Sequence, residues 1–581
     1  MSRKPFKATE EQKNVIAHSS CAFISACPGA GKTQVLVERA RYELKEMSTG
    51  KGLAFLSFTN AAIFELKSRL QSEALLLNPA FPHYVGTFDS FIWQFFIASL
   101  GIPGQMKAPR LIPDMDDRVI VPYDKAQQLT LSCFDRVTGK MIPEKAKLAG
   151  FDAASKPALT SKYEASARQC RERFLARGEV GFSDVRAIVK DHLTNLPLSA
   201  KLSAALAARF REIVVDEAQD CSPADIEIIN WLRAAGIVTK IICDPHQSIY
   251  EFRGGVTDQL FELRNSFHQS QRLEMKGNFR SNPNVCKAIA AFRAPGEQDP
   301  TDEPVGPAAN DMTPIQVLHY SGNSIPISIG QTFKRLVQDN NLSPTDCPVI
   351  SSTKDAACKA IGQAVAATTQ DRTLRLALAV TSFHAGLEVN VRKQAMESLH
   401  GIVLELGGKM KEKTYHQYIV AENLKPEDWR PTVLDLLQKL ALDPARDADA
   451  DAWLARARVD MAPYLGDSGG SIAQKLRKHQ SLGEILTCNP MPSLRARTIH
   501  SVKGLEFPGV CVVLSTTTCK DIIDYLTIGK PAKSAEGARK LYVAVSRAER
   551  LLVIAAPKSQ GSRLVAHIKK TGAEVTEIIL T

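Results

Sequence analysis

The stretch Ala26-Cys27-Pro28-Gly29-Ala30-Gly31-Lys32-Thr33 constrains this chain more than any other feature. Apolar runs at 21–24 and 35–37 flank it, which predicts a strand, a glycine-rich turn and a helix. Gly29 and Gly31 can adopt backbone angles that other residues avoid, so successive N–H groups can converge on phosphate oxygens at the helix N-terminus. Lys32 is then expected to reach the β- and γ-phosphates of a nucleotide, and Thr33 to hold Mg²⁺. The alternative is a glycine turn with a chance lysine.

A second strong pattern is the run Ile213-Val214-Val215-Asp216-Glu217. An apolar strand here is predicted to deliver two adjacent carboxylates to its C-terminal end. Phosphoryl transfer needs one carboxylate to hold Mg²⁺ through its water shell and another to orient and deprotonate an attacking water. We therefore assign the metal to Asp216 and the general base to Glu217. An acidic strand end without such a role is the alternative.

Composition sets broad limits on the protein class. The 581 residues are enough for roughly three or four domains, and 23% charged with 44% hydrophobic residues is ordinary for a globular protein. A net charge of +11 favours a polyanionic partner, although solvated basic faces also produce such a value. No run approaches the roughly 20 apolar residues of a membrane span, and residues 1–7 do not resemble a signal peptide, so we expect a cytoplasmic protein. The 12 cysteines include no C-x-x-C pair, which argues against a zinc or iron–sulfur centre.

Several other polar residues lie beside predicted strands or helices. Gln12 lies in the first turn of a predicted helix, and its amide can both donate to and accept from an adenine edge. Gln247 follows the strand 238–243, where an amide could sense a γ-phosphate, and Thr59-Asn60 follow the strand 53–58. Taken alone, Gln12 fits a surface residue better, and a simple helix N-cap explains Thr59 or Asn60 equally well.

Two features are typical of nucleic-acid contacts. Between Lys140 and Arg177 nine basic residues stand against four acidic ones, which makes this helical region a candidate for binding a phosphate backbone. An ordinary solvated helix face explains the pattern equally well. Tyr250, Phe252 and Arg253 offer flat surfaces on which unpaired bases could stack, although aromatics packed into a core fit as well.

In this order, these segments resemble the motifs of UvrD/Rep-like superfamily 1 helicases. Three later segments resemble the family's fourth, fifth and sixth motifs: Asn278-Phe279-Arg280-Ser281, Arg497-Thr498-Ile499-His500-Ser501-Val502-Lys503-Gly504-Leu505-Glu506-Phe507 and Lys540-Leu541-Tyr542-Val543-Ala544-Val545-Ser546-Arg547-Ala548. The resemblance implies an α/β fold of two RecA-like P-loop NTPase domains with parallel sheets, each carrying a mainly helical inserted subdomain. The expected bounds are 1–92 and 211–272 for the first motor domain, 93–210 for its insertion, 273–365 and 489–581 for the second motor domain, and 366–488 for its reduced insertion.

The resemblance also implies a site for ATP and Mg²⁺ between the two motor domains. Arg280 and Arg547 would act as arginine fingers from the second domain, with Glu506 near the ribose. The implied catalytic residues are Lys32, Glu217, Gln247, Arg280 and Arg547; the metal residues are Thr33 and Asp216; and the nucleotide-binding residues are Gln12, Ala26, Pro28, Gly29, Ala30, Gly31, Lys32, Thr33, Gln34, Phe279 and Glu506.

DNA contacts are implied by position in the same motifs. They are Phe58, Thr59, Asn60, Thr87, Phe252, Arg253, His500 and Lys503. This chain departs from the family's pattern at Ala61, Gln34 and Phe252, where relatives often have lysine, arginine and tryptophan, and at Phe279, which replaces a usual tyrosine. These departures bear on stepping and base preference more than on hydrolysis.

The implied function is an ATP-dependent single-stranded DNA translocase and 3′-to-5′ DNA helicase acting on single-stranded or partly duplex DNA. The segment 366–488 looks short for the family, and only residues 551–581 follow the sixth motif, so we expect no fused nuclease. This raises an alternative: a nucleotide-controlled, DNA-sensing subunit that regulates a separate nuclease partner in repair or anti-phage defence, as in Gabija-type systems. A P-loop phosphotransferase acting on a small molecule is a third hypothesis, which leaves the later motifs unexplained.

Overall fold

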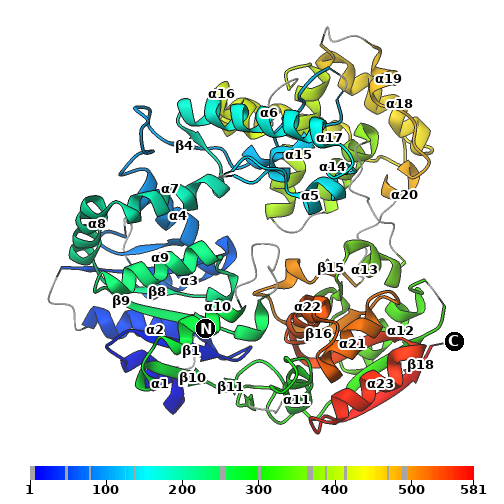
Figure 1. Ribbon diagram of the computed structural model, residues 1–581. Helices are drawn as coiled ribbons and strands as arrows, with labels where there is room; N and C mark the ends of the chain where they lie inside the picture. Colours follow the sequence, from blue (N-terminus) through cyan, green and yellow to red (C-terminus); the bar gives the residue numbers. More distant parts are fainter. Residues whose placement is uncertain are drawn as a thin grey trace. The chain divides into compact units, whose positions relative to one another are not determined.

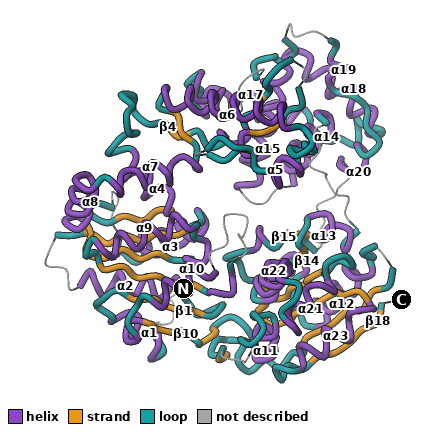
Figure 2. Tube along the Cα trace, in the orientation of Figure 1, coloured by secondary structure: helices purple, strands orange, loops and turns teal. Residues whose placement is uncertain are grey.

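The computed structural model describes residues 7–45, 50–76, 80–124, 126–136, 138–248, 257–298, 302–322, 324–362, 371–385, 389–410, 415–466, 470–486 and 494–580. The chain divides into two compact units. The first comprises Met1–Phe91, Leu193–Gln363 and Pro492–Thr581, and the second comprises Ile92–His192 and Ala364–Met491. Figure 1 follows the chain through both units, and Figure 2 shows the strands gathered mainly in the first.

A six-stranded parallel sheet forms around the glycine-rich stretch. Its strand order is β10-β1-β9-β8-β2-β3, and every neighbouring pair is parallel. The strands are β1 (Ala22–Ala26), β2 (Gly52–Ser57), β3 (Tyr84–Thr87), β8 (Phe210–Val215), β9 (Val238–Cys243) and β10 (Arg272–Met275). Because all strands run the same way, the segments that follow β1, β8 and β9 meet at one edge of the sheet.

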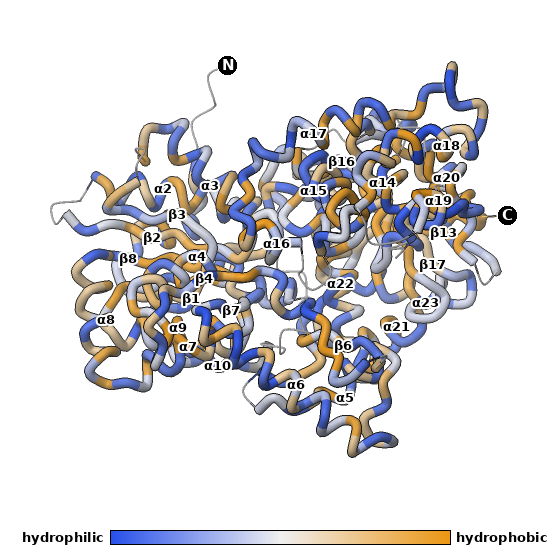
Figure 3. The backbone as a smooth tube through the Cα atoms, turned by 90° about the horizontal axis from the view of Figure 1, so that it is seen from above, coloured by the Kyte–Doolittle hydropathy of each residue, from blue (hydrophilic) through white to orange (hydrophobic). Residues whose placement is uncertain are grey.

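Helices pack beside this sheet and have recognisable caps. They are α1 (Glu10–Ala17), α2 (Lys32–Lys45), α3 (Asn60–Ser72), α4 (Phe88–Ile92), α8 (Leu196–Arg209), α9 (Pro223–Ala234) and α10 (Thr257–Asn265). Thr9 and Gln12 form a capping box at the start of α1, and Ser222 and Asp225 form one at the start of α9. Apolar residues dominate β2 and β8, as the colouring in Figure 3 shows.

A second six-stranded parallel sheet belongs to the same unit. Its order is β15-β14-β16-β17-β13-β18, formed by β13 (Ile315–Tyr320), β14 (Val349–Ser351), β15 (Ala496–Thr498), β16 (Phe507–Val513), β17 (Ala548–Pro557) and β18 (Val575–Ile579). Its helices are α11 (Pro283–Ala291), α12 (Ser328–Asp339), α13 (Lys354–Ala360), α21 (Cys519–Ile528), α22 (Ala535–Val545) and α23 (Lys558–Lys569).

The second sheet is buried on both faces. Along β17, Leu552 and Ile554 belong to one hydrophobic cluster and Leu551 and Val553 to another. Since alternate side chains of a strand point to opposite faces, each face of the sheet has its own core. The predicted α/β fold with two parallel sheets is confirmed.

The expected domain bounds differ from the observed elements at two places. The expected end of the first motor domain after residue 272 falls inside β10, which pairs with β1 in the first sheet. The expected insertion 93–210 includes α8, which lies in the first unit, where Trp231 Nε1 donates to Ser199 Oγ over 2.8 Å. Two short strands, β11 (Gly277–Asn278) and β12 (Glu303–Pro304), pair with each other in the segment that follows β10.

The second unit is mainly helical. It contains α5 (Pro143–Leu148), α6 (Pro157–Ala176), most of α7 (Phe182–Thr194), α14 (Arg372–Ala385), α15 (Val389–Leu406), α16 (Tyr415–Ala421), α17 (Pro426–Lys439), α18 (Ala450–Met461), α19 (Ile472–Lys475) and α20 (Leu482–Leu486). Two strand pairs accompany them: β4 (Arg110–Leu111) with β7 (Glu179–Val180), and β5 (Val119–Ile120) with β6 (Leu129–Thr130). One core surrounds Tyr163 and Phe134, and another surrounds Trp453 and Leu437.

Within the described ranges, none of the helices has both the length and the hydrophobicity needed to span a bilayer.

Candidate functional site

The turn between β1 and α2 requires glycine for two physical reasons. Gly29 and Gly31 have φ angles of +74° and +73°, which glycine adopts without strain. A Cβ at position 29 would lie 2.4 Å from Asn278 Oδ1 and 2.7 Å from Arg280 Cβ. The main chain also closes on this turn, because Phe279 N donates to Gly29 O over 2.9 Å. The glycine-rich turn therefore packs directly against the segment that resembles the fourth motif.

A cavity of about 1010 Å³ opens beside this turn. Its walls come from segments of both parallel sheets, and Lys32 stands at its base as the first residue of α2. The residues that line it include Pro28, Gly29, Ala30, Gly31, Lys32, Thr33, Gln34, Glu65, Arg69, Glu217, Gln247, Phe279, Arg280, Leu505, Glu506, Arg547, Glu549 and Arg550.

Lys32 and Glu217 form an ion pair in this cavity, with Nζ 2.9 Å from Oε1. Burial alone would lower the pKa of Lys32, but the Glu217 and Asp216 carboxylates raise it above its ordinary value. Burial alone would raise the pKa of Glu217, but Lys32 and Lys503 lower it to about 2. Glu217 is therefore ionised and electrostatically held, and it is a poor proton acceptor in this arrangement.

Asp216 has the opposite environment. Burial and the neighbouring Glu217 charge raise the pKa of Asp216 to about 7. One of its oxygens accepts from Glu217 N over 2.9 Å, while Glu217 itself adopts the left-handed backbone conformation with φ of +57°. A non-glycine residue in that conformation is strained, and such strain is common at functional sites. The two neighbouring carboxylates thus have pKa values displaced in opposite directions.

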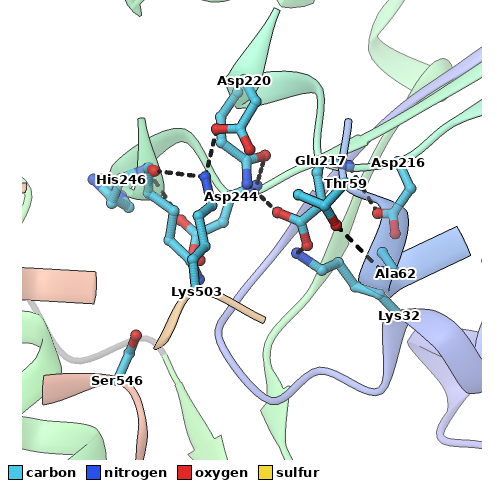
Figure 4. A network of polar contacts seen from close by, with 12 residues as sticks. Lys32, Thr59, Ala62, Asp216, Glu217, Asp220, Asp244, His246, Lys503 and Ser546 are labelled. Atoms are coloured by element: carbon cyan, nitrogen blue, oxygen red, sulfur yellow. Dashed lines mark hydrogen bonds and ion pairs between the residues drawn. The ribbon is translucent and has the colours of Figure 1, made fainter. Parts of the chain in front are cut away.

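A chain of hydrogen bonds links Glu217 to both sheets, and Figure 4 shows the part of it around Glu217 and Asp244. Gln219 Nε2 donates to Glu217 Oε2, and Gln219 Oε1 accepts from Asp244 N over 3.1 Å. Asp244 Oδ2 then accepts from Gln247 Nε2 over 2.9 Å and from Tyr542 Oη over 3.1 Å. Asp244 therefore joins the segment after β9 to α22 of the second sheet.

Arg547 completes this network from the second sheet. Its Nη2 donates to Gln247 Oε1 over 3.2 Å, and its other hydrogen bonds go to carbonyl oxygens of Val543 and Leu505 and to Ser546 Oγ. Burial and the neighbouring Arg280 lower the pKa of Arg547 to about 9. All these acceptors are neutral, so among the described residues no carboxylate is hydrogen-bonded to this buried guanidinium, although Glu217 and Asp244 are near enough to oppose the lowering of its pKa.

Arg280 is positioned by the same sheet. Its Nη1 donates to Ser546 O over 2.9 Å, and its Nε donates to Glu506 Oε2 over 2.9 Å. Ser281 Oγ and Asn282 N bond to the carbonyls of Ala548 and Glu549 in β17. The second sheet thus brings two guanidinium groups to a cavity whose base is the glycine-rich turn of the first sheet.

Two domain families match this chain. Residues 8–268 match the UvrD/REP helicase N-terminal domain, and residues 474–559 match the UvrD-like helicase C-terminal domain. Together the matches cover more than half of the chain. It belongs to the UvrD/Rep helicase family. The two parallel sheets are accordingly those of the RecA-like domains that the resemblance implied.

Curated relatives are similar at low identity. The ATP-dependent DNA helicase srs2 of Schizosaccharomyces pombe is 25% identical over 357 residues, covering 57% of this chain and 40% of the relative. The ATP-dependent DNA helicase UvrD1 of Mycobacterium tuberculosis is 24% identical over 301 residues, covering 48% and 38%. The putative ATP-dependent DNA helicase YjcD of Bacillus subtilis is 24% identical over an alignment of 620 residues, covering 95% and 79%. The chain thus spans about two fifths of the length of the first two.

The donor set of the cavity fits a nucleotide with Mg²⁺. The turn is a cradle that a Cβ at Gly29 would fill, and Lys32, Arg280 and Arg547 supply positive charge around it. Thr33 lines the cavity, and the Asp216 carboxyl with its raised pKa would gain from a cation as counter-charge. Hydroxyl and carboxylate oxygens are the ligands that Mg²⁺ prefers.

Three other residues that family resemblance assigns to the nucleotide have local partners. Gln12 is buried behind the turn, where its Nε2 donates to Ala30 O over 3.0 Å and its Oε1 accepts from Thr9 N over 3.1 Å. Gln34 accepts from Arg69 Nη1 over 3.3 Å and donates to Glu38. Ala26 ends β1 and is buried. Gln12 therefore supports the turn itself, and its contact with adenine stays a prediction.

Four of the residues assigned to DNA gather after β2 and β3. Phe58 stacks on Phe88 with ring centroids 5.2 Å apart, and Thr59 caps α3 by accepting from Ala62 N. Asn60 is exposed, and Thr87 hydrogen-bonds with Ser90. His500 begins a short helical turn after β15. Phe252 and Arg253, like Tyr250, lie outside the described residues.

Lys503 has a placement that sequence reasoning did not anticipate. Its Nζ forms an ion pair with Asp220 and donates to Gln247 O over 3.4 Å, and the side chain is 6% exposed. In this arrangement its charge is directed at the first sheet's acidic loop (Figure 4). A direct DNA contact by Lys503 stays a prediction.

Sequence reasoning missed several residues of this site. Arg69 lines the cavity from α3, and Gln219, Asp244 and Tyr542 form the network described above. Tyr542 lies inside the segment that resembles the sixth motif, and Gln219 lies two residues after Glu217; these positions were the available signal. Arg69 lies four residues after Glu65, with which it forms an ion pair, and nothing in that helical spacing pointed to a nucleotide.

Proposed function

We propose that this chain is an ATP-dependent DNA helicase that hydrolyses ATP between its two RecA-like domains and moves along single-stranded DNA. The observation that carries the proposal is one cavity lined by the glycine-rich turn of the first sheet and by Arg280 and Arg547 held on the second. The family matches and the relatives' names support the same activity. The 3′-to-5′ direction rests on the family resemblance.

The proposal assigns the residues of the chain to two motor domains and the insertion that each one carries. Residues 1–92 and 211–272 form the first motor domain, with 93–210 inserted; residues 273–365 and 489–581 form the second, with 366–488 inserted. We extend the proposed first domain to include β10 and α8, since β10 pairs with β1 and α8 lies in the first unit. A nucleotide held at the seam then depends on charges from two separately folded sheets.

Glu217 would become a working base only after the nucleotide binds. Lys32 is expected to exchange its carboxylate partner for phosphate oxygens, which are more highly charged acceptors. Glu217 then loses the positive neighbour that contributes most to its low pKa, so its basicity increases where a water must be deprotonated. In the absence of ATP, the ion pair keeps the base inactive.

Thr33 and Asp216 would hold Mg²⁺, which supplies positive charge to the phosphate oxygens. Gln247 is suited to sense the γ-phosphate, because its amide already bridges Asp244 and Arg547. Arg280 and Arg547 would stabilise the charge that develops during phosphoryl transfer. Asp216, Gln247, Arg280 and Arg547 are held by hydrogen bonds before any substrate arrives, so these four side chains need little reorganisation.

The DNA strand is proposed to lie along the carboxyl ends of β2 and β3. Phe58, Thr59, Asn60 and Thr87 stand there, and Phe252, Arg253, His500 and Lys503 complete the proposed contacts. Aromatic rings accept any base by stacking, which suits binding without sequence preference.

A direct test measures ATP hydrolysis with and without single-stranded DNA, and strand separation on duplexes with a 3′ or a 5′ single-stranded tail. We expect hydrolysis to be strongly stimulated by DNA and to be abolished by Lys32→Ala, and unwinding to require the 3′ tail. Turnover that ignores DNA and survives Lys32→Ala would overturn the proposal. DNA-stimulated hydrolysis without unwinding of either substrate would instead favour a DNA-sensing subunit that serves a separate nuclease.

A further inference from the structure

The second unit contains a cavity of about 720 Å³ that shares no residue with the nucleotide cavity. One wall is a face of α6, on which Ser166, Gln169, Cys170 and Arg173 recur at helical spacing. The adjoining face of α6 packs Tyr163, Ala167 and Phe174 into the core, and Cys170 lies against the same core. The helix is therefore anchored in the core beside the face that lines the cavity.

The charge lining this cavity is strongly one-sided. Arg110, Arg118, Arg173 and Arg177 line it, and Glu179 is the single acidic residue among the lining residues that the structure describes. Arg110 and Arg177 share the Glu179 carboxylate, at 3.0 Å and 2.8 Å. Arg118 and Arg173 have no carboxylate within 4.0 Å in the described part of the chain. Two guanidinium groups are thus unneutralised.

Nearby acidic residues do not cancel this charge. Asp116 lies 3.9 Å from Arg171, and Asp114 Oδ2 accepts from His416 N over 3.2 Å. Burial raises the pKa of the Cys170 thiol, while Arg118, Arg171, Arg173 and Arg177 oppose that rise. The guanidinium groups of these four arginines therefore all lie close enough to Cys170 on α6 to change its electrostatic environment.

The remaining wall is apolar. It is formed by Ile112 and by Val119–Pro122, and Val119 and Val121 remain 43% and 44% exposed. A ligand that fills this cavity must present negative charge to the arginines and apolar surface to β5. A nucleic-acid strand has both, because phosphates alternate with sugars and bases. A small inorganic anion would leave the apolar wall uncovered.

We infer that this arginine-lined cavity binds the sugar–phosphate backbone of nucleic acid. It is a contact separate from the residues that the motifs assign to DNA, since it lies outside all of them. The inference rests on the proposed function only for its choice of ligand, because the proposed DNA helicase has a nucleic-acid strand as its substrate.

The first test compares the double variant Arg118→Ala/Arg173→Ala with Arg446→Ala/Arg477→Ala in the full-length protein. The control removes the same charge from exposed positions of the second unit that do not line the cavity. Affinity for oligothymidylate is measured between about 50 and 200 mM salt. Each lost phosphate contact reduces the slope of log affinity against log salt by about 0.7, so we expect a loss of about 1.4 for the arginine pair. At about 0.1 M salt this corresponds to an affinity lower by tenfold or more.

Equal slopes and affinities for the two double variants would overturn the inference. ATP hydrolysis in the absence of DNA is measured on the same samples, and we expect both double variants to retain it. If wild-type hydrolysis is stimulated by DNA while the arginine variant binds normally, the inference fails and the proposed function stands. If wild-type protein shows neither binding nor stimulation, the proposed function fails with it.

A second test needs no variant. Cys170 stands on the cavity wall, so its rate of alkylation, followed by mass spectrometry of its peptide, reports occupancy. We expect oligothymidylate to slow alkylation of Cys170 and to leave Cys21, at the start of β1, unchanged. ATP alone and polyglutamate are the comparison ligands. Alkylation unaffected by saturating oligothymidylate would overturn the inference, as would equal protection by polyglutamate or ATP.

Discussion

At the scale of single residues, the site is governed by how one charge offsets another. Lys32 and Glu217 neutralise each other across 2.9 Å, whereas Arg547 has only neutral acceptors. In the proposed mechanism, the first pair would keep Lys32 and Glu217 inactive until a nucleotide binds, and the second arrangement would leave a cation available for an incoming anion. Both conditions depend on burial, since water would screen charges at an exposed site.

The role of Glu217 gives the first prediction. Glu217→Gln keeps the shape but removes the base, so we expect DNA-stimulated ATP hydrolysis to fall by about 10²- to 10⁴-fold. Nucleotide binding should be retained, because Lys32 no longer has a carboxylate competing for it. Steady-state hydrolysis and titration with a fluorescent ATP analogue measure the two effects. Glu65→Gln, which changes a carboxylate lining the same cavity, is the control, and equal losses in both variants would contradict the assignment.

At the scale of elements, the strands of the first motor sheet could be predicted because local patterns agreed with one another, whereas the second sheet was implied only by the family resemblance. Apolar strands followed by glycine, acidic or amide residues recur along the chain, and parallel strands bring their carboxyl ends together. Residues 28–34 of the turn, together with Glu217 and Gln247, accordingly line one cavity. The position of β10 could not be predicted in the same way. The strand has only four residues, which are too few to show a hydrophobic periodicity.

Contacts between distant elements were the part that sequence could not supply. Tyr542 and Asp244 are separated by almost three hundred residues, and their hydrogen bond depends on how α22 packs near the end of β9. The motif likewise assigns Lys503 to DNA, and nothing in the motif indicated that Lys503 pairs with Asp220 in the folded chain. A motif gives residue types and order, whereas the partner of a long side chain is decided by packing.

The Asp244–Tyr542 bond gives a second prediction. Tyr542→Phe removes one hydroxyl at a position that links the two sheets, so Gln247 is oriented less firmly. We expect kcat of DNA-stimulated hydrolysis to fall about tenfold with little change in KM, equivalent to about 1.4 kcal/mol.

Tyr320→Phe is its matched control. Tyr320 is also buried, and its hydroxyl donates to Leu514 O over 2.7 Å within the second sheet. Thermal unfolding should respond similarly to both changes. A fall in kcat of equal size in both variants would show that the Asp244 contact has no specific role.

The helical second unit gives a third prediction, about acid. His400 on α15 stacks on Trp429 of α17 with centroids 4.5 Å apart, and burial followed by Lys409 lowers the pKa of His400 to about 4. The folded pKa lies below the unfolded value of about 6.5, so the neutral ring stabilises the fold above that pH. This contribution is lost as the pH falls toward 4, by about 2 kcal/mol between pH 6.5 and 4.5.

Hydrogen exchange of α15 and α17, corrected for intrinsic rates, measures this loss. We expect His400→Phe to weaken the dependence on pH, and His479→Phe, a change at a partly exposed histidine outside the stack, to leave it unchanged. An identical dependence in wild type and His400→Phe would contradict the prediction.

At the scale of the whole molecule, hydrolysis is predicted to need both sheets of the first unit. Arg547→Ala removes a charge contributed entirely by the second sheet, and an arginine in this role contributes about 10³-fold or more to kcat. We therefore expect hydrolysis to fall by at least about 10³-fold while nucleotide binding persists.

Arg550→Ala is the control for this prediction. Arg550 lines the same cavity but pairs with Asp311 and is more exposed. Rates of hydrolysis and nucleotide affinities are measured for both variants. Comparable losses of activity would mean that general positive charge, rather than a placed guanidinium, supports turnover.

The hydrogen bond from Phe279 N to Gly29 O is formed between two main-chain groups. A change of side chain at position 279 leaves both the donor N–H and the acceptor C=O of this hydrogen bond in place. Among the standard amino acids, only proline would remove the N–H donor. This point of attachment can therefore survive extensive divergence in sequence, as in a family whose members here share about a quarter of their residues. Natural variation can therefore alter the side chains around the nucleotide without deleting this main-chain bond between the turn and the segment after β11.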